Sequence, residues 1–490
     1  MNATSVAVII LGYFLVLFVI ARFTGKKADT DTFFTAGRQS PWYVVAFGMI
    51  GASLSGVTFI SVPGWVGASK FTYMSMVIGY LAGYLAIAYI LLPLYYRLNL
   101  VSIYTYLEKR FGFYSYKTGA GFFLISRIIG ASFRLFLVAG VLQLAVFNHW
   151  GIPFGVTVTI AIALIWVYTL KGGIKTVVWT DTLQTMFMLL AVSITIIIIG
   201  NKMDWGFTEI VGNVKSSSFN KWFEMDVDKP NFWLKNFLAG AFITLTMTGL
   251  DQDMMQKNLT CRSLKDAQKN MLWFSVILVV VNLVFLSLGA LLFMYSEKNG
   301  IPIPKDTDNL YPNLALNSLG PAAGILFMLG IIAAAYSSAD SALTALTTSF
   351  CYDFLNIKKY PEAKRKKIKL ITHIGMSVTL LIVILIFNEI KRDNVIKELF
   401  NAAGYTYGPL LGLFAYGLFI RKKLKWEIMV PVVAVISPIV TYLLVLNSED
   451  LFGGYQIGFE KLLINGLFTI VGLLIITDWN SRDEELSAVE

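Results

Sequence analysis

Apolar residues fill long runs of this chain, and short polar or charged segments separate the runs. A transmembrane helix needs about 20 mostly apolar residues. Because such runs recur along the whole chain, the pattern predicts an all-α polytopic membrane protein without a sizeable soluble domain. We expect about 13 transmembrane helices, near residues 4–22, 42–68, 73–96, 118–147, 153–170, 176–200, 233–256, 270–295, 321–354, 370–389, 396–420, 427–446 and 460–478.

The composition supports the same class. Of the 490 residues, 56% are hydrophobic and only 14% are charged, and the mean hydropathy is +0.67. A soluble globular domain carries roughly 25% charged residues. The first apolar run has no basic segment before it, so we expect no cleavable signal peptide. The two cysteines and the two histidines are far apart in sequence and suggest neither a disulfide framework nor a zinc site.

Lysines and arginines concentrate in alternate loops. The segment from Lys358 to Lys369 is the clearest case, and we also count Lys257 and Arg262 among these loop cations. Basic loops face the cytoplasm in membrane proteins. We therefore expect a multi-pass protein of the plasma membrane (the cytoplasmic membrane if bacterial), with its N-terminus outside and its C-terminus in the cytoplasm. The net charge of +10 reflects this orientation signal, and we expect no nucleic-acid partner.

A row of hydroxyl groups runs along the apolar segment from Gly330 to Phe350. Ala334, Ser337, Ser338 and Ser341 are spaced i, i+3, i+4, i+7 and share one helical face, with Asp340 on its flank. A carboxylate at membrane depth is costly and usually faces a polar cavity, so this helix is a candidate cation site. The alternative is that small hydroxyl residues only allow close helix packing. We favour that alternative for Thr344, Thr347 and Thr348.

Two predicted spans are interrupted by glycine and polar residues. The segment 48–58 places Gly51, Ser53 and Ser55 in mid-membrane, and the segment 244–256 places Thr248 and Gly249 there. Glycine-interrupted helices at matching positions in two halves of a chain point to the substrate site of a transporter. The spacing predicts two five-helix repeats, which must have opposite topology because five is an odd number.

Charged residues inside other predicted spans allow two interpretations, one structural and one functional. Arg127 and Arg134 are seven residues apart and share a helical face in the span 118–147. Each needs a partner, which is either a structural carboxylate or carbonyl, or an anionic group of a substrate. Asp181 lies in the second turn of a helix that follows Gly172 and Gly173. It either complements the helix dipole or meets the hydroxyl helix.

At several of these segments the chain resembles the sodium/solute symporter family, which includes the sodium/glucose, proline and sialic acid carriers. The resemblance lies in the Gly-Gly, Trp-Thr-Asp and Gln of segment 168–184, in the segment 250–259, and in Ala334-x-x-Ser-Ser, and it runs from about Phe33 to about Lys425. It implies a LeuT-type 5+5 inverted repeat. We expect an extra helix and a cytoplasmic loop in residues 1–40, the two repeats in 41–200 and 201–425, and two further helices with a short tail in 426–490.

The resemblance also implies ion sites. Backbone carbonyls of Gly51, Leu54 and Ala334 and the hydroxyls of Ser337 and Ser338 match the main sodium site of the family. A candidate second sodium site matches Asp181, Ser337, Asp340 and Ser341, although two-site members of the family carry a hydroxyl residue where this chain has Asp340. The resemblance therefore leaves one or two sodium ions per cycle open.

The positions that match the substrate cavity suit more than one kind of solute. Gly130 stands where the sialic acid carriers place a carboxylate-binding Arg, and Val77 stands where they place a Gln, but Arg134 is one helical turn from Gly130. Hydroxyls and aromatics suit a sugar, whereas an Arg suits a carboxylate. The matching substrate positions are Ser55, Thr58, Phe59, Tyr73, Arg134, Thr248, Gln252, Asn401, Tyr405 and Thr406.

These observations predict a sodium-coupled secondary active symporter that imports a small polar organic solute, such as a sugar, a sugar acid or another carboxylate, by alternating access. Na⁺ is the expected coupling ion, and we expect no organic cofactor and a functional monomer. The alternative is a transporter-like sensor or a passive cation channel. We expect neither, because a sensor normally carries a signalling domain and a channel a repeated filter or charged ring, and we recognise neither pattern in this sequence. An enzyme is not expected, because no cluster with catalytic spacing lies in the spans.

Overall fold

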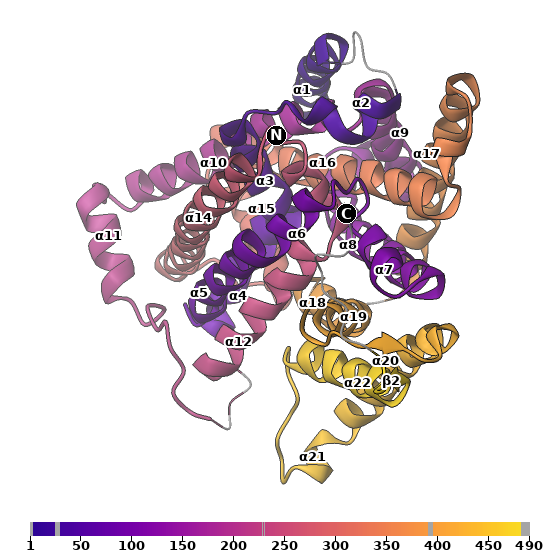
Figure 1. Cartoon of the computed structure of the whole chain (residues 1–490). Helices are drawn as coiled ribbons and strands as arrows, with labels where there is room; N and C mark the ends of the chain where they lie inside the picture. Colours follow the sequence, from indigo (N-terminus) through magenta and orange to yellow (C-terminus); the bar gives the residue numbers. More distant parts are fainter. Residues whose placement is uncertain (1–2, 25–29, 228, 230, 391–394, 482–490) are drawn as a thin grey trace.

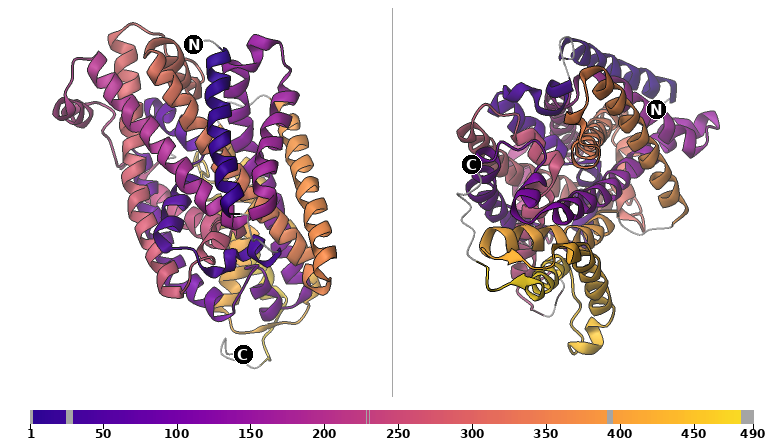
Figure 2. Two further views of the ribbon diagram at one scale, coloured as in Figure 1. Left: turned by 90° about the horizontal axis from the view of Figure 1, so that it is seen from above. Right: turned by 45° about the vertical axis from the view of Figure 1, so that its right-hand side comes forward.

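The computed structural model describes residues 3–24, 30–227, 229, 231–390 and 395–481. Within these ranges almost all regular structure is helical, as the sequence predicted, and the long helices run roughly along one common axis (Figures 1 and 2). Seven of the described helices are long and apolar enough to cross a membrane, and the number is eight if one bent pair counts as a single span. Four shorter apolar helices accompany them. The total of 13 crossings remains a prediction.

Each predicted span coincides with a helix or with consecutive helices. In chain order these are α1 (Ala3–Thr24), α3 (Trp42–Ser53) with α4 (Gly56–Ser69), α5 (Tyr73–Ala86) with η2 (Ile87–Leu91) and α6 (Leu92–Arg97), α8 (Phe113–Ala145), α9 (Phe154–Gly172), α10 (Ile174–Lys202), α12 (Trp233–Thr244) with η4 (Leu245–Gly249) and α13 (Gln252–Asn258), α14 (Leu264–Lys298), α16 (Pro321–Ser349) with η7 (Phe350–Phe354), α17 (Glu362–Glu389), α18 (Val395–Thr406) with α19 (Gly408–Phe419), α20 (Val430–Leu446) and α22 (Lys461–Ile475).

Short elements lie in the connections. The α-helices among them are α2 (Thr30–Thr35), α7 (Thr105–Arg110), α11 (Phe207–Ser216), α15 (Leu310–Asn313) and α21 (Ser448–Leu451). The others are η1 (Ala36–Arg38), η3 (Phe147–Trp150), η5 (Thr307–Asn309), η6 (Leu314–Ser318), η8 (Ile357–Lys359) and η9 (Glu427–Met429). Strand β1 (Lys423–Leu424) pairs antiparallel with β2 (Thr477–Asp478) and ties the segment after α19 to the segment after α22.

Helix α16 forms the centre of the bundle. It packs against α1, α3, α4, α8, α9, α10, α13 and α17, and every residue from Gly330 to Ser349 is buried. Small residues make this possible, because they let neighbouring helices approach closely. At Gly330 an added Cβ would come within 2.6 Å of Phe59 and 2.7 Å of Ala191. The hydroxyl helix predicted from the sequence is therefore enclosed by the other helices.

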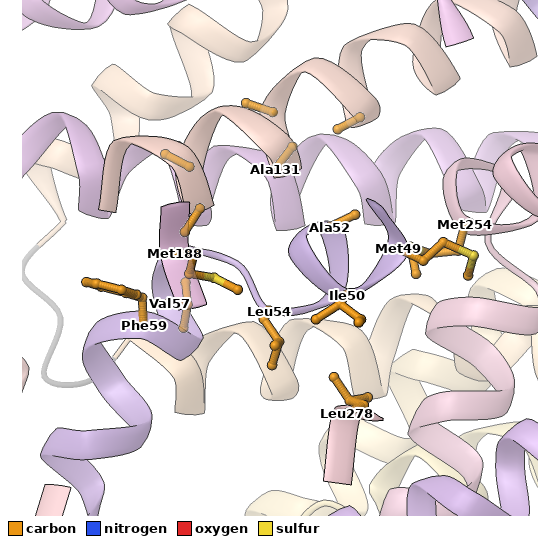
Figure 3. Close-up of a cluster of buried hydrophobic side chains, with 14 of the residues drawn as sticks. Met49, Ile50, Ala52, Leu54, Val57, Phe59, Ala131, Met188, Met254 and Leu278 are labelled. Carbon is orange, nitrogen blue, oxygen red and sulfur yellow. The ribbon is translucent and has the colours of Figure 1, made fainter. Parts of the chain in front are cut away.

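Both predicted interruptions are present. The axes of α3 and α4 differ by 57°, and Leu54, with φ −84° and ψ 74°, leaves the helical conformation between them (Figure 3). In the second half, the π-helical turn η4 ends at Gly249, and α13 starts at Gln252. The Asp251 carboxylate caps α13 by accepting hydrogen bonds from the backbone N–H groups of Asp253 and Met254. Both breaks contact α16 through the neighbouring helices α3, α4 and α13.

Candidate functional site

The break between α3 and α4 lies against the hydroxyl face of α16. The last backbone hydrogen bond of α3 runs from the N–H of Leu54 to the carbonyl of Ile50, and the carbonyls that follow are helix-end acceptors. The Ser338 hydroxyl lies 3.5 Å from the carbonyl oxygen of Ala52. A Cβ added to Gly51 would be 3.3 Å from the Ser337 hydroxyl oxygen. The structure therefore brings two of the predicted sodium ligands, Gly51 of α3 and Ser337 of α16, side by side, and it places Ser338 at the neighbouring carbonyl of Ala52.

The five residues predicted for the main site are all buried, namely Gly51, Leu54, Ala334, Ser337 and Ser338. The prediction uses the backbone oxygens of the first three and the hydroxyls of the two serines. Oxygen ligands suit a hard cation such as sodium. Phe59, Leu54 and Val57 extend from the broken helix among apolar side chains such as Met188 and Leu278 (Figure 3). This apolar packing covers one side of the break, and polar oxygens that face buried apolar side chains interact more strongly with charge than oxygens in water do.

The second predicted ion position contains an ion pair. The Ser337 hydroxyl donates a hydrogen bond of 2.6 Å to Asp181 Oδ1, and Lys257 Nζ lies 2.7 Å from Asp181 Oδ2. The side chains of Asp181 and Lys257 are 0% and 1% exposed. Lys257 was expected in a cytoplasmic loop, and that expectation is wrong. Helix α13 continues to Asn258, beyond the predicted end of its span at residue 256, and carries Lys257 into the protein interior.

A second buried cluster joins α8, α13 and α16. The Arg127 guanidinium forms an ion pair with Asp253 and lies 3.8 Å from Asp251 Oδ2. The Ser341 hydroxyl donates a hydrogen bond to Asp253, and Tyr407 donates one of 2.5 Å to Asp251. Ser341, which was predicted at the second ion position, therefore makes its side-chain hydrogen bond to Asp253. Of the two readings of Arg127, the structure supports the structural ion pair.

Asp340 occupies the flank of the hydroxyl face, as its position in the helix predicted. It is fully buried, and its Oδ1 accepts a hydrogen bond of 2.6 Å from the backbone N–H of Ser341. It also interacts electrostatically with Tyr13 of α1. When the amide of Gln184 is oriented with its nitrogen toward the acceptors, Gln184 donates to Asp181 Oδ1 at 3.2 Å and accepts from Tyr13 at 3.1 Å. A continuous polar network thus extends from α1 to α10.

A narrow cavity of about 90 Å³ adjoins the break in α3 and α4. Half of the predicted substrate residues line it, namely Ser55, Thr58, Tyr73, Arg134 and Thr248. Arg134 is 8% exposed, and among the described residues it forms no ion pair. Its Nε is buried without a hydrogen-bond partner. The cavity wall therefore carries a cation that no described carboxylate neutralises by direct contact.

The other five predicted substrate residues lie outside this cavity. Phe59 is fully buried, and its ring packs on Tyr311 and Phe327. The Gln252 amide bonds the backbone of Val101 and Ile103 and thereby fixes the loop before α7. Residues of α18 make contacts with other partners: Asn401 accepts from Lys461, Tyr405 contacts the ring of Tyr442, and Thr406 bonds the Ala402 carbonyl.

Several cavity residues escaped the sequence prediction. Tyr80 and Tyr84 line the cavity together with Tyr73, and the hydroxyls of Tyr73 and Tyr80 are 2.9 Å apart. The spacing of these tyrosines, i, i+7 and i+11, places them on one helical face and is the signal that could have identified them. The apolar part of the wall carries no such signal in the sequence. It comprises Ala52, Val57, Ile243, Met247, Met254, Leu399 and Phe400.

Comparison with known proteins agrees with this geometry. Residues 33–426 match the profile of the Sodium:solute symporter family. The chain is 26% identical over 450 residues to the sodium/sialic acid symporter NanT of Aliivibrio fischeri, with 88% of this chain and 85% of that protein covered. It is also 26% identical over 407 residues to the human sodium-coupled monocarboxylate transporter 2, with 80% of this chain and 64% of that protein covered.

A solved structure shares the fold. A Na⁺-coupled sialic acid symporter in a substrate-bound, outward-open state superposes with a TM-score of 0.80 at 21% identity, covering 96% of this chain and 97% of that one. The architecture is the LeuT-type inverted repeat that the sequence predicted. The family and these relatives are transporters rather than enzymes. The chain therefore belongs to the sodium:solute symporter family and is a sodium-coupled membrane transporter of small organic solutes.

Proposed function

We propose that this symporter imports an organic carboxylate and that Arg134 binds the carboxylate group. The main support for this proposal is the position of Arg134. This residue lines the cavity, is largely buried and lacks an ion-pair partner among the described residues. A buried cation without a partner is costly, and a substrate carboxylate would remove that cost. The planar guanidinium also offers parallel N–H donors that match a carboxylate.

Arg127 supports this assignment by contrast. It lines the same cavity from the same helical face, but Asp253 already neutralises it. Of the two arginines, Arg134 is thus the one that remains available to an anion. The start of α4 adds a second favourable element, because Ser55 at its N-cap makes no capping hydrogen bond and the positive end of the helix dipole attracts negative charge.

The remaining wall suits a small acid with further polar groups. Hydroxyls of Ser55, Thr58 and Thr248 can donate or accept hydrogen bonds, while Met247 and Phe400 offer apolar contact. The names of the relatives agree with an acid, since they include sialic acid symporters and monocarboxylate transporters. A neutral sugar would leave Arg134 without a counter-charge.

For the coupling ion, we propose the main sodium site formed by the carbonyls of Gly51, Leu54 and Ala334 and the hydroxyls of Ser337 and Ser338. The approach of Ser338 to the Ala52 carbonyl and of Gly51 to Ser337 supports it. We also propose the orientation with the N-terminus outside and the C-terminus in the cytoplasm, repeats at 41–200 and 201–425, and a functional monomer that uses no organic cofactor.

A thermal-shift experiment on the purified protein tests the carboxylate. N-acetylneuraminate, lactate, butyrate and, as neutral probes, glucose and butyramide are added in sodium chloride or in choline chloride. Since a coupled ligand stabilises more when its co-ligand is bound, an acid should raise the melting temperature mainly in sodium. Stabilisation by a neutral probe to the same extent, retained in Arg134→Gln, would overturn the assignment of Arg134.

A further inference from the structure

We infer that the ammonium group of Lys257 is a built-in cation that occupies the second ion position beside Asp181, so that this symporter binds one sodium ion per cycle. The inference rests on the proposed main sodium site at Ser337 and Ser338 and extends it to the stoichiometry of coupling. The main evidence for the inference is the 2.7 Å contact between Lys257 Nζ and Asp181 Oδ2.

Burial makes this contact a fixed part of the site. Lysine is almost never fully buried unless it is paired, and here both side chains are almost completely enclosed. Every residue of α13 from Gln252 to Asn258 is buried, and α13 packs on α3, α10 and α16. Among the described residues, Asp181 is the carboxylate that pairs with Lys257. Separating the two charges inside the protein would leave both uncompensated.

The oxygens of Asp181 are already used. Oδ2 contacts the Lys257 ammonium, and Oδ1 accepts hydrogen bonds from Ser337 and, in the satisfied amide orientation, from Gln184. A sodium ion at this carboxylate would have to displace the ammonium or lie next to it. Two unit cations about 4 Å apart repel each other strongly in a medium of low dielectric constant.

The other oxygens predicted for a second sodium ion also have partners. The Ser341 hydroxyl donates its hydrogen to Asp253, and Asp340 Oδ1 accepts from the backbone N–H of Ser341. Ser341 and Asp340 are therefore engaged in the neighbouring network. The ammonium group of Lys257 supplies the positive charge that a second sodium ion would otherwise bring to Asp181.

The same ion pair orients a ligand of the main site. A hydroxyl that binds a cation must direct its lone pairs to the ion and its hydrogen elsewhere. Ser337 donates its hydrogen to Asp181, which leaves the lone pairs of its oxygen for the side where Gly51 approaches. Asp181 is thus a positioning residue for the main sodium site, and Lys257 keeps its charge balanced.

Equilibrium binding of ²²Na⁺ to the purified full-length protein, without added solute, tests the inference. We expect one ion per chain in the wild type, one in Lys257→Arg, and two in Lys257→Gln, where the Asp181 carboxylate is freed. A second neutral variant, Lys257→Met, should also bind two ions, and it keeps the test valid if Lys257→Gln alone folds poorly.

Two outcomes would overturn the role of Lys257: two ions bound by the wild type, or one ion bound by a folded Lys257→Gln protein. Failure of the proposed main site would look different. In that case the wild type would bind no sodium, or Ser338→Ala would bind it with unchanged affinity, whatever residue stands at position 257.

Discussion

Arg127 of α8, which lines the cavity beside the break, forms an ion pair with Asp253 of α13, and the two side chains are 4% and 0% exposed. The pair joins α8 to α13, the helix that follows the break after η4. Ser341 of α16 donates to the same carboxylate, so three helices meet at Asp253. Arg127 therefore has a structural partner, whereas Arg134 on the same face has none among the described residues.

Breaking this pair should destabilise the protein. In Arg127→Met the Asp253 carboxylate remains buried without its counter-charge, and loss of one partner of a buried pair costs about 3–5 kcal/mol. The melting temperature in detergent should fall clearly for Arg127→Met and recover in the double variant Arg127→Met/Asp253→Leu, which removes both charges. If the double variant melts as low as the single one, the ion pair is not what stabilises this junction.

Arg134→Gln should behave in the opposite way. Because Arg134 has no ion-pair partner among the described residues, the melting temperature without solute should stay near that of the wild type. Affinity for the acid identified in the thermal-shift screen should drop, since a hydrogen bond to a charged group contributes about 1.5–3 kcal/mol. That loss corresponds to roughly 10- to 150-fold weaker binding, measurable by calorimetry in sodium. Unchanged affinity would exclude Arg134 as the carboxylate ligand.

Periodicity and glycine placement were enough to predict much of the fold. The hydroxyl face of α16 and both helix breaks follow from local sequence, because backbone geometry alone decides which residues share a face and where glycine weakens a helix. The pairing partners did not follow. Lys257 was expected in a loop because the predicted span ended at residue 256. The helix continues for two more residues, and this small shift of the boundary places Lys257 in the protein interior instead of in solvent.

The substrate residues were predictable only in part for a related reason. The packing of α20 and α22 on α18 decides which face of α18 meets the cavity. In the structure, Asn401 accepts a hydrogen bond from Lys461, and the ring of Tyr405 contacts the ring of Tyr442. By contrast, Ser55 is the N-cap of α4 and Thr58 lies in its first turn, where the local sequence determines their position. Long-range packing therefore limits prediction of the cavity more than prediction of the ion site.

Gly51→Ala should impair sodium binding by crowding the main site. The added Cβ would meet the Thr185 hydroxyl oxygen at 2.3 Å and the Ser337 hydroxyl oxygen at 3.3 Å, so one of these side chains must shift. Overpacking of this kind costs typically 1–3 kcal/mol. We expect weaker ²²Na⁺ binding and a lower melting temperature. Gly121→Ala in α8 is the matched control, because no atom lies within 4 Å of its added Cβ. Equal effects of the two substitutions would contradict a specific role of Gly51.

Asp340→Ser separates the role of Asp340 from that of Lys257 near the second ion position. The substitution restores the hydroxyl residue that two-site members of the family carry there, but it leaves the Lys257 ammonium beside Asp181. If Lys257 is what excludes a second ion, Asp340→Ser should still bind one ²²Na⁺ per chain, and Asp340→Ser/Lys257→Gln should bind two. Two ions bound by Asp340→Ser alone would shift the explanation to Asp340, whose carboxylate would then hold the local network in a form that sodium cannot enter.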